Sequence, residues 1–158
     1  MRRNSWWVAV ALTMALSGAA GAQGRPLNAT GTQQLNFGSV FPGVQQIVPW
    51  SDPANGGRFS LTGRNRSEIQ LIFTLPASLI APGGRTLPLQ FGPNDGAWNQ
   101  QNAAGTAQTF DPRSPLVVRL SNQGRMFIWL GGTARPSGTQ TAGTYTGSIT
   151  LTASYTGN

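Results

Sequence analysis

The chain has 158 residues, of which 11 are Lys or Arg, 4 are Asp or Glu, and none is His or Cys, so its formal net charge is +7. All the basic residues are arginines. Without His, Cys or Lys the chain lacks an ordinary general base near neutral pH, an activated nucleophile and a transition-metal ligand set. We therefore expect no enzyme, no cofactor and no metal site, and only a glycosidase-like pair of Glu68 with one Asp stays open.

Residues 1 to 22 have the pattern of a secretory signal peptide. Arg2 and Arg3 precede an apolar run over residues 6 to 16, and an A-x-A cleavage site follows at residues 20 to 22. The apolar run is well short of the roughly 20 residues that a membrane-spanning helix needs. We expect export to the periplasm, the cell surface or the medium, although the two arginines leave a folded-protein export signal open.

The mature chain, residues 23 to 158, is predicted to form one all-β domain with a charge of about +5. Turn-forming residues interrupt it every 8 to 12 residues or so, and no window has the spacing of an amphipathic helix. The candidate strands cover residues 33 to 38, 44 to 50, 57 to 62, 68 to 75, 86 to 91, 115 to 121, 125 to 130 and 143 to 155. About eight short strands predict an immunoglobulin-like antiparallel β-sandwich.

Two segments are expected to lie outside these strands. Residues 23 to 32 precede the first predicted strand and are expected to form a flexible N-terminal tail. Residues 92 to 108, rich in Asn, Gln, Gly and Ala, form the longest predicted loop. A long loop in a compact domain is either functional or mobile.

Four side chains are candidates for contact with a ligand. Trp98, in the middle of the long loop, is expected either to pack onto the sandwich or to contact a ligand, whereas Trp129 lies in an apolar run typical of a core. Arg58, Arg64 and Arg66 form either a solvated face and turn or a contact for an anionic surface polymer. The arginines are scattered and the chain is expected to be exported, so nucleic acid is not the expected partner.

Three of the four acidic residues lie in turn dipeptides, Asp52-Pro53, Asp95-Gly96 and Asp111-Pro112. Aspartate in such a setting usually accepts hydrogen bonds from the backbone of its own turn. We therefore expect these carboxylates to be structural and not to bind metal.

The last predicted strand, GTYTGSITLTASY over residues 143 to 155, is unusually long and regular. Its alternation predicts one apolar face and one hydroxyl-bearing face. Thirteen residues at 3.3 Å each would span about 43 Å, and neither a charge nor a proline lies between residue 137 and the end. Gly147 is the residue expected to bend this strand. The candidates for a strand-pairing interface are Gly143, Tyr145, Ile149, Leu151 and Tyr155.

Four pieces of the sequence carry a resemblance to a known family. They are LNFGSVFPG at residues 35 to 43, FSLTG at 59 to 63, LIFTLP at 71 to 76, and GTYTG at 143 to 147 together with Tyr155. In this order they resemble the bacterial family described as domain of unknown function 4402, which implies an exported protein of a Gram-negative cell. More loosely, Gly143 and Tyr155 are similar to the final strand of chaperone-usher pilins, although three residues follow Tyr155 and the chain has no disulfide.

The pilin similarity implies a fimbrial subunit with a structural or adhesive function, which assembles with identical or related subunits by β-strand addition. In that case the donor strand would be the tail, through Leu27, Ala29 and Gly31. The alternative is a self-contained monomeric binding module, periplasmic or secreted. The sequence leaves both functions open, together with the identity of the partner.

Overall fold

The computed structural model of the protein describes residues 24 to 157, so the predicted signal peptide lies outside the described residues. These residues form twelve strands and one short 3-10 helix, and every strand pair is antiparallel. The prediction of an all-β fold is confirmed. Within residues 24 to 157, no helix is long and apolar enough to span a membrane.

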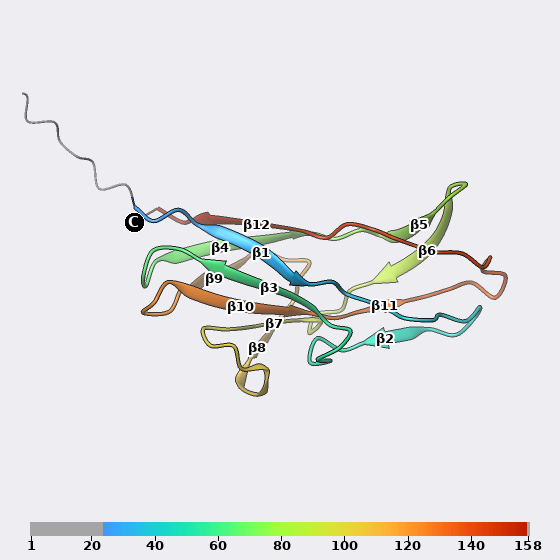
Figure 1. Cartoon of the computed structure of the whole chain (residues 1–158), viewed down its shortest axis with the longest axis horizontal. Coiled ribbons are helices and arrows are strands. Elements are labelled where there is room, and N and C mark those ends of the chain that lie inside the picture. Colours follow the sequence, from blue (N-terminus) through green and yellow to red (C-terminus); the bar gives the residue numbers. More distant parts are fainter. Residues whose placement is uncertain (1–23, 158) are drawn as a thin grey trace, which may run out of the picture.

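The strands form three sheets, which Figure 1 labels in chain order. The elements are β1 (Asn28–Gln33), β2 (Gln46–Val48), β3 (Gly57–Thr62), β4 (Glu68–Thr74), β5 (Ser78–Ala81), β6 (Arg85–Gln90), β7 (Gly96–Asn99), η1 (Ala104–Thr106), β8 (Gln108–Phe110), β9 (Leu116–Arg119), β10 (Arg125–Leu130), β11 (Gly132–Ala134) and β12 (Thr150–Tyr155). The sheet orders are β1-β3-β10-β7-β8, β2-β11-β6-β5 and β12-β4-β9.

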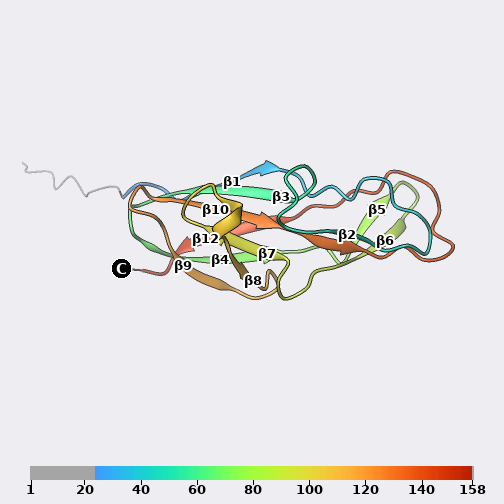
Figure 2. The ribbon, with the colours of Figure 1, turned by 90° about the horizontal axis from the view of Figure 1, so that it is seen from below.

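The five-stranded sheet and the three-stranded sheet face one another and form a sandwich. In Figure 2, β1 and β3 lie along one side while β4 and β9 lie along the other. The alternating strands each bury one face, because successive side chains point to opposite sides of a sheet. In β4, for example, Ile69 and Leu71 are buried while Glu68 and Ile72 are exposed. The buried core between the sheets consists of Leu61, Ile69, Leu71, Phe110, Val118, Leu120, Met126 and Ile128.

The four-stranded sheet extends the molecule beyond this sandwich and has a second core (Figure 1). Its buried residues are Phe37, Val48, Leu87 and Ala134. Two connections are short: residue 131 alone separates β10 from β11, and residues 75 to 77 separate β4 from β5. The two halves are therefore joined by nearly continuous strands.

The start of the fold differs from the sequence-based expectation. The tail expected over residues 23 to 32 is wrong for residues 28 to 32, because they belong to β1, which pairs with β3. The strand expected at residues 33 to 38 is also wrong, since only Gln33 lies in a strand. Leu35 and Phe37 instead join the second core from an irregular segment.

The long loop expected over residues 92 to 108 is wrong as well. It contains β7, η1 and the first residue of β8, and β7 is the fourth strand of the five-stranded sheet. The polar composition of this segment gave no strand signal. The residues that connect β7, η1 and β8 lie at the surface, where polar side chains are common, so the segment as a whole resembles a loop.

The terminal strand is shorter than predicted. β12 covers only Thr150–Tyr155, and the residues before it make a single bridge, between Thr146 and Ile80. Gly147 lies between the two paired parts, and a Cβ added to it would be 2.9 Å from the Cδ2 atom of Leu79. The chain therefore passes close to the Leu79 side chain of β5 at Gly147, and the pairing resumes at β4.

Candidate functional site

The terminal segment has one open edge along its length. Thr146 and Ile80 exchange both backbone hydrogen bonds, at 2.7 and 2.9 Å, and the Thr156 N–H donates to the Glu68 carbonyl oxygen at 3.3 Å. In an antiparallel ladder, every second residue of a strand bonds to the neighbouring strand. The Thr156 bond shows that the even-numbered residues of β12 are the ones that bond to β4. The backbone groups of Leu151, Ala153 and Tyr155 therefore point away from β4. We call this row of N–H and C=O groups the β12 edge.

Nothing in the described part of the chain pairs with the β12 edge, since β4 is the only strand bonded to β12. β1 lies near it without forming a ladder (Figure 1). Proteins usually protect such an edge with lysine, proline or a bulge. Residues 137 to 158 contain neither a charge nor a proline.

The five predicted interface residues divide into two groups. Leu151 and Tyr155 lie in β12 and pack against the first core, with their side chains half-buried. Gly143, Tyr145 and Ile149 lie before the strand. The Tyr145 ring packs against the second core, and its hydroxyl donates to the Thr141 carbonyl oxygen at 2.6 Å. The structure therefore distributes these residues over both halves of the molecule.

Tyr155 joins three segments at the end of the sandwich. Its hydroxyl accepts a hydrogen bond from the Arg64 backbone N–H at 2.7 Å and donates one to the Arg25 carbonyl oxygen at 2.9 Å. The Arg64 guanidinium lies over its ring. The hydroxyl also lies where Gly63 would carry a Cβ, at a distance of 2.6 Å. A glycine before Arg64 is therefore needed for this contact.

The proposed donor residues make few apolar contacts. Ala29 and Gly31 are exposed in β1, and the burial pattern of that strand shows no buried position. Leu27, which precedes β1, is the one of the three that packs against the first core. A donor strand is expected to fill a groove with alternating apolar side chains. β1 instead covers the edge of β3 mainly with backbone hydrogen bonds.

Trp98 and Trp129 occupy opposite faces of the same sheet. Trp98, in β7, is half-buried and packs against the first core. Of the two roles expected for this residue, this is packing onto the sandwich. Trp129 is buried with 3% of its surface exposed, as predicted. It lies opposite Arg58 in the β3–β10 register, on the face away from the first core.

A shallow cavity of about 240 Å³ lies beside Arg58, and we call it the sheet cavity. It is lined by Thr32, Arg58, Phe59, Ser60, Asn102, Phe127, Ile128 and Trp129. The Arg58 Nη2 atom donates to the Pro53 carbonyl oxygen at 3.0 Å. The Arg58 Nε atom is buried without a hydrogen-bond partner among the described residues. The sheet cavity thus has one cation, aromatic rings and hydroxyl groups.

Arg58 does not cluster with Arg64 and Arg66. It lies near the start of β3, and the other two follow the end of that strand, so about 20 Å of extended chain separates them. The expectation of one three-arginine group is wrong for this reason. Arg64 and Arg66 instead lie beside arginines from other strands.

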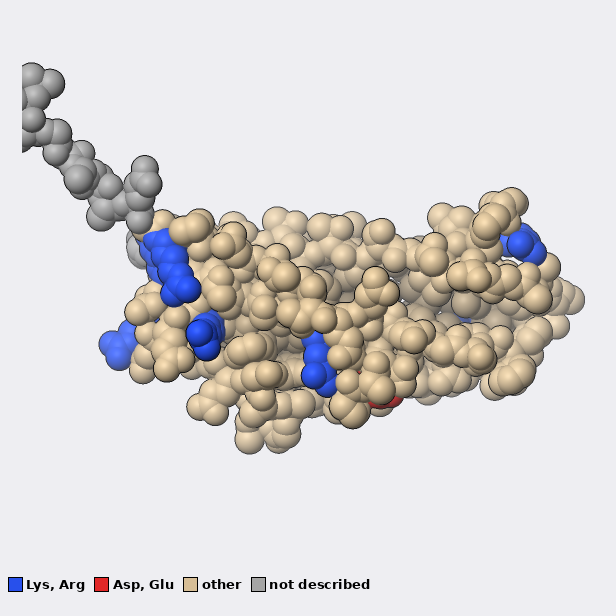
Figure 3. All heavy atoms as spheres, in the orientation of Figure 1, with Lys and Arg blue, Asp and Glu red and all other residues tan. Residues whose placement is uncertain are grey.

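Five arginines gather at the end of the sandwich where the β3–β4 and β9–β10 turns lie, and we call this the basic end. Figure 3 shows blue surface concentrated there, at the left of the molecule. The Arg66 N–H donates to the Ser121 carbonyl oxygen at 3.0 Å, and its Nε atom donates to the Asn122 Oδ1 atom at 2.6 Å. The members of the basic end are Arg25, Arg64, Arg66, Arg119 and Arg125.

A cavity of about 310 Å³ opens at the basic end, and we call it the end cavity. It is lined by Asn65, Arg66, Ser67, Glu68, Arg119 and Thr156. The Glu68 Oε1 atom accepts a hydrogen bond from the Thr156 hydroxyl at 2.8 Å. No aspartate lines this cavity, so Glu68 is not paired with an Asp there in the way that a glycosidase-like carboxylate pair requires.

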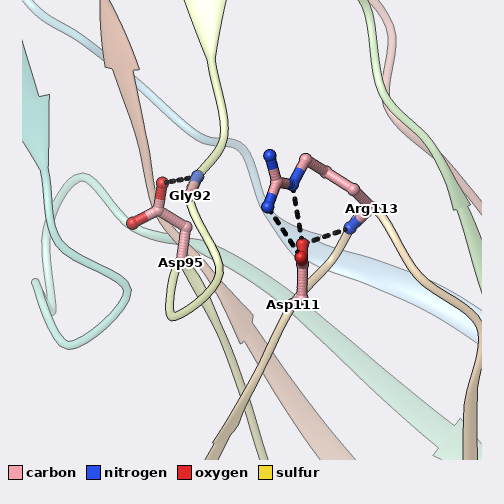
Figure 4. Close-up of polar contacts among 4 residues, drawn as sticks. All are labelled: Gly92, Asp95, Asp111 and Arg113. Atoms are coloured by element: carbon pink, nitrogen blue, oxygen red, sulfur yellow. Dashed lines mark hydrogen bonds and ion pairs between the residues drawn. The ribbon is translucent and has the colours of Figure 1, made fainter.

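The three aspartates accept hydrogen bonds from their own turns, as predicted. Figure 4 shows the Asp95 Oδ2 atom accepting from the Gly92 N–H at 2.6 Å, and Asp111 accepting from the backbone and side chain of Arg113. The Arg113 side chain, followed by its backbone N–H, lowers the pKa of Asp111. The Asn55 side chain and nearby backbone N–H groups lower the pKa of Asp52. Within residues 24 to 157 no three His, Cys, Asp or Glu side chains form a metal-binding group.

Sequence reasoning missed two features of this surface. The bridge between Ile80 and Thr146 was not expected, because β5 was not among the predicted strands. Arg119 was not grouped with Arg66, because the two are far apart in sequence. The pairing of β4 with β9, in which Glu68 lies opposite Arg119, brings them to the same cavity. The one available signal for β5 was the short apolar run Leu79-Ile80-Ala81, which ends at the turn sequence Pro82-Gly83-Gly84.

No protein-family model matches the chain, and none of the curated proteins compared with it matches. The family resemblance of the four sequence pieces therefore stays a prediction, and the features that bear on function are the β12 edge, the sheet cavity and the end cavity.

Proposed function

We propose that the protein is an exported, non-catalytic structural or adhesive subunit of a Gram-negative cell, whose copies associate by strand pairing along the β12 edge. The proposal includes an immunoglobulin-like, pilin-like architecture for the sandwich. The observation that carries it is the row of backbone groups at Leu151, Ala153 and Tyr155, on an uncharged strand, with which no strand of residues 24 to 157 pairs.

An extended segment from a second copy would complete this edge. Main-chain hydrogen bonds supply the attraction in β-strand addition, and neighbouring side chains supply the specificity. The simplest partner is β12 of the second copy, because one edge used by both copies is self-complementary about a two-fold axis. The three-stranded sheet would then continue into its counterpart as a six-stranded sheet.

This association does not require β1 to leave its own sandwich. β1 pairs with β3 of the same chain, and its exposed Ala29 and Gly31 would contribute little apolar contact to a neighbouring groove. Pairing at the β12 edge keeps the first core intact, because the side chains of Leu151, Ala153 and Tyr155 already pack against it. The proposal is therefore edge addition, and not exchange of the N-terminal strand.

The absence of catalysis is part of the same proposal. Three carboxylates are engaged in their own turns, and Glu68 is bonded to Thr156. This arrangement supports a binding or structural role, since neither the sheet cavity nor the end cavity is lined by a pair of carboxylates.

A proline substitution tests the proposal at one backbone atom. The Ala153→Pro variant removes an N–H that points out of the β12 edge, while the hydrogen bonds between β12 and β4 are kept. Analytical ultracentrifugation of residues 23 to 158 is expected to show concentration-dependent association for the unmodified chain and a monomer for the variant. Cooperative thermal unfolding of both proteins establishes that the variant is folded.

Ala29→Pro is the matched control. The Gly63 N–H donates to the Gly124 carbonyl oxygen, so the odd-numbered residues of β3 bond to β10 and the even-numbered ones bond to β1. Ala29 lies opposite Leu61, an odd-numbered residue, so the Ala29 N–H points away from β3 and out of the open edge of β1. This variant is expected to associate like the unmodified chain. Equal association of Ala153→Pro and the unmodified chain, at concentrations where the latter is dimeric, would exclude pairing at the β12 edge.

A second candidate function is a self-contained monomeric binding module, and two observations favour it. β1 completes the five-stranded sheet within one chain, and the sheet cavity holds Arg58, whose buried Nε atom has no hydrogen-bond partner in the described part of the chain and lies beside aromatic rings. A chain that stays monomeric at millimolar concentration, with fast hydrogen exchange at the N–H groups of Leu151 and Ala153, would favour this function over edge addition.

A further inference from the structure

The charge at the basic end is almost uncompensated. Among residues 24 to 157, five arginines lie there with a single carboxylate, that of Glu68. The one ion pair within the described residues joins Arg113 to Asp111, elsewhere on the molecule. Uncompensated charge of one sign over a small area attracts groups of the opposite sign over a distance of about a Debye length.

Two of these arginine side chains, those of Arg64 and Arg66, are held in place by the fold. The Arg64 guanidinium lies 4.1 Å from the centre of the Tyr155 ring. The Arg66 side chain donates to Asn122, and Arg66 itself has a φ of 55°, a left-handed conformation that is rare outside glycine and asparagine. Such conformations recur at binding sites, where the surrounding structure maintains them. The cations are therefore partly ordered before any ligand binds.

The end cavity combines two kinds of polar group. Arg66 and Arg119 supply charged donors, and arginine is suited to bind carboxylate or phosphate oxygens in pairs. Asn65, Ser67 and Thr156 supply amide and hydroxyl groups, which pair with neutral hydroxyls. The Glu68 carboxylate has one oxygen bonded to Thr156, and its second oxygen is an acceptor for a hydroxyl.

We propose that the end cavity binds an anionic polysaccharide, with the acidic groups of the polymer at Arg66 and Arg119 and its sugar hydroxyls at Ser67, Glu68 and Thr156. The basic end around the cavity then holds further acidic groups along the same polymer. This inference does not rest on pairing at the β12 edge, because a monomer has the complete cavity.

A polysaccharide fits this surface better than a single-stranded nucleic acid does. Proteins that bind single strands stack the bases on exposed aromatic rings. No aromatic ring of the described residues lines the end cavity, and the Tyr155 ring at the same end of the sandwich is covered by Arg64. The Glu68 carboxylate can accept hydrogen bonds from sugar hydroxyls, which a polysaccharide carries on its residues and a DNA single strand lacks.

Binding of the purified protein to sodium alginate, a polymer of uronic acids, tests the site directly by isothermal titration calorimetry. Neutral dextran and a thirty-residue oligothymidylate are the comparison probes. We expect alginate to bind at low ionic strength, dextran not to bind, and the oligonucleotide to bind more weakly than alginate per charge. Added salt should weaken the alginate complex.

Two double variants with equal loss of charge separate the site from the net charge. Arg66→Ala with Arg119→Ala is expected to weaken alginate binding roughly tenfold or more, because two charge-assisted contacts are lost. Arg85→Ala with Arg135→Ala removes two arginines from the half of the molecule that contains β6 and β11, and is expected to leave the affinity within about twofold. Thermal unfolding of each variant checks that it is folded.

Three results would overturn the inference. They are no binding of alginate at low salt, an equal loss of affinity in both double variants, and tighter binding of the oligonucleotide than of alginate. The second would mean that net charge alone attracts the polymer, and the third would mean a nucleic-acid interface. Failure of the Ala153→Pro test would leave these measurements unchanged, so the two proposals can fail separately.

Discussion

The Arg64 guanidinium lies 4.1 Å from the centre of the Tyr155 ring, at the point where the final strand ends beside the β3–β4 turn. The same tyrosine bonds through its hydroxyl to the backbone of Arg64 and of Arg25, so one side chain connects the beginning, the middle and the end of the described chain. Tyr155 also packs against the first core. We therefore expect it to stabilise the open side of the sandwich, where β1 and β12 lie.

Tyr155→Phe tests this role because it removes only the hydroxyl. The Arg64 N–H would lose its acceptor in a partly buried position, which costs about 1 to 3 kcal/mol of unfolding free energy. Urea unfolding of the two proteins measures the difference. Tyr145→Phe is the matched control, since the Tyr145 hydroxyl bonds within its own loop, to Thr141 and Gln140. Equal losses in the two variants would argue against a special role for Tyr155.

Gly63→Ala tests the close approach beside Tyr155. An added Cβ would be 2.6 Å from the tyrosine hydroxyl and 2.9 Å from methyl carbons of Leu120 and Leu27, so several groups would have to move. We expect a loss of about 1 to 3 kcal/mol of unfolding free energy, as for other additions to a filled site. Gly105→Ala is the control, because nothing lies within 4 Å of its added Cβ. A neutral Gly63→Ala would show that the Tyr155 contact is readily displaced.

The strands that could be predicted are those with one buried face. Residues 57 to 62 and 125 to 130 were predicted with the bounds that the structure has. Leu61 lies between two less buried residues, and residues 126 to 130 form a continuous apolar run. β1 could not be found in this way, because its six residues are small or polar and none is buried. Hydrophobic alternation identifies a strand by the side chains that it turns toward the core. β1 buries no side chain and is held to β3 by backbone hydrogen bonds, which leave no such pattern in the sequence.

The β12 edge and the end cavity could not be predicted, because they depend on which strands are neighbours in the folded chain. The apolar alternation of Leu151, Ala153 and Tyr155 was readable, and their side chains do face the first core. Whether a strand lies beside the other edge is a matter of sheet order, which alternation does not encode. Likewise Arg66 and Arg119 are far apart in sequence and come together only through the pairing of β4 with β9.

Ile128→Ala tests the first core. Ile128 has no exposed surface and lies in β10, a central strand of the five-stranded sheet. Truncation is expected to cost about 2 to 5 kcal/mol of unfolding free energy, from lost apolar burial and the cavity left behind. Ile72→Ala, on the outer face of β4 with 42% of its surface exposed, is expected to cost well under half of that. Similar losses would contradict the placement of the core between the two sheets.

Asp111→Asn tests the electrostatic part of the β8–β9 turn. The Arg113 side chain, followed by its backbone N–H, lowers the pKa of the Asp111 carboxyl below the ordinary value of 3.8. A carboxyl with a lowered pKa in the folded state contributes stability above its unfolded pKa, and this contribution is lost as the pH falls through the folded pKa. The variant is therefore expected to be less stable than the unmodified chain at pH 7, with the difference shrinking below about pH 4. Urea midpoints measured from pH 7 to pH 2.5 give the two curves. Curves that stay parallel over this range would mean that the contact with Arg113 does not stabilise the fold through ionisation of Asp111.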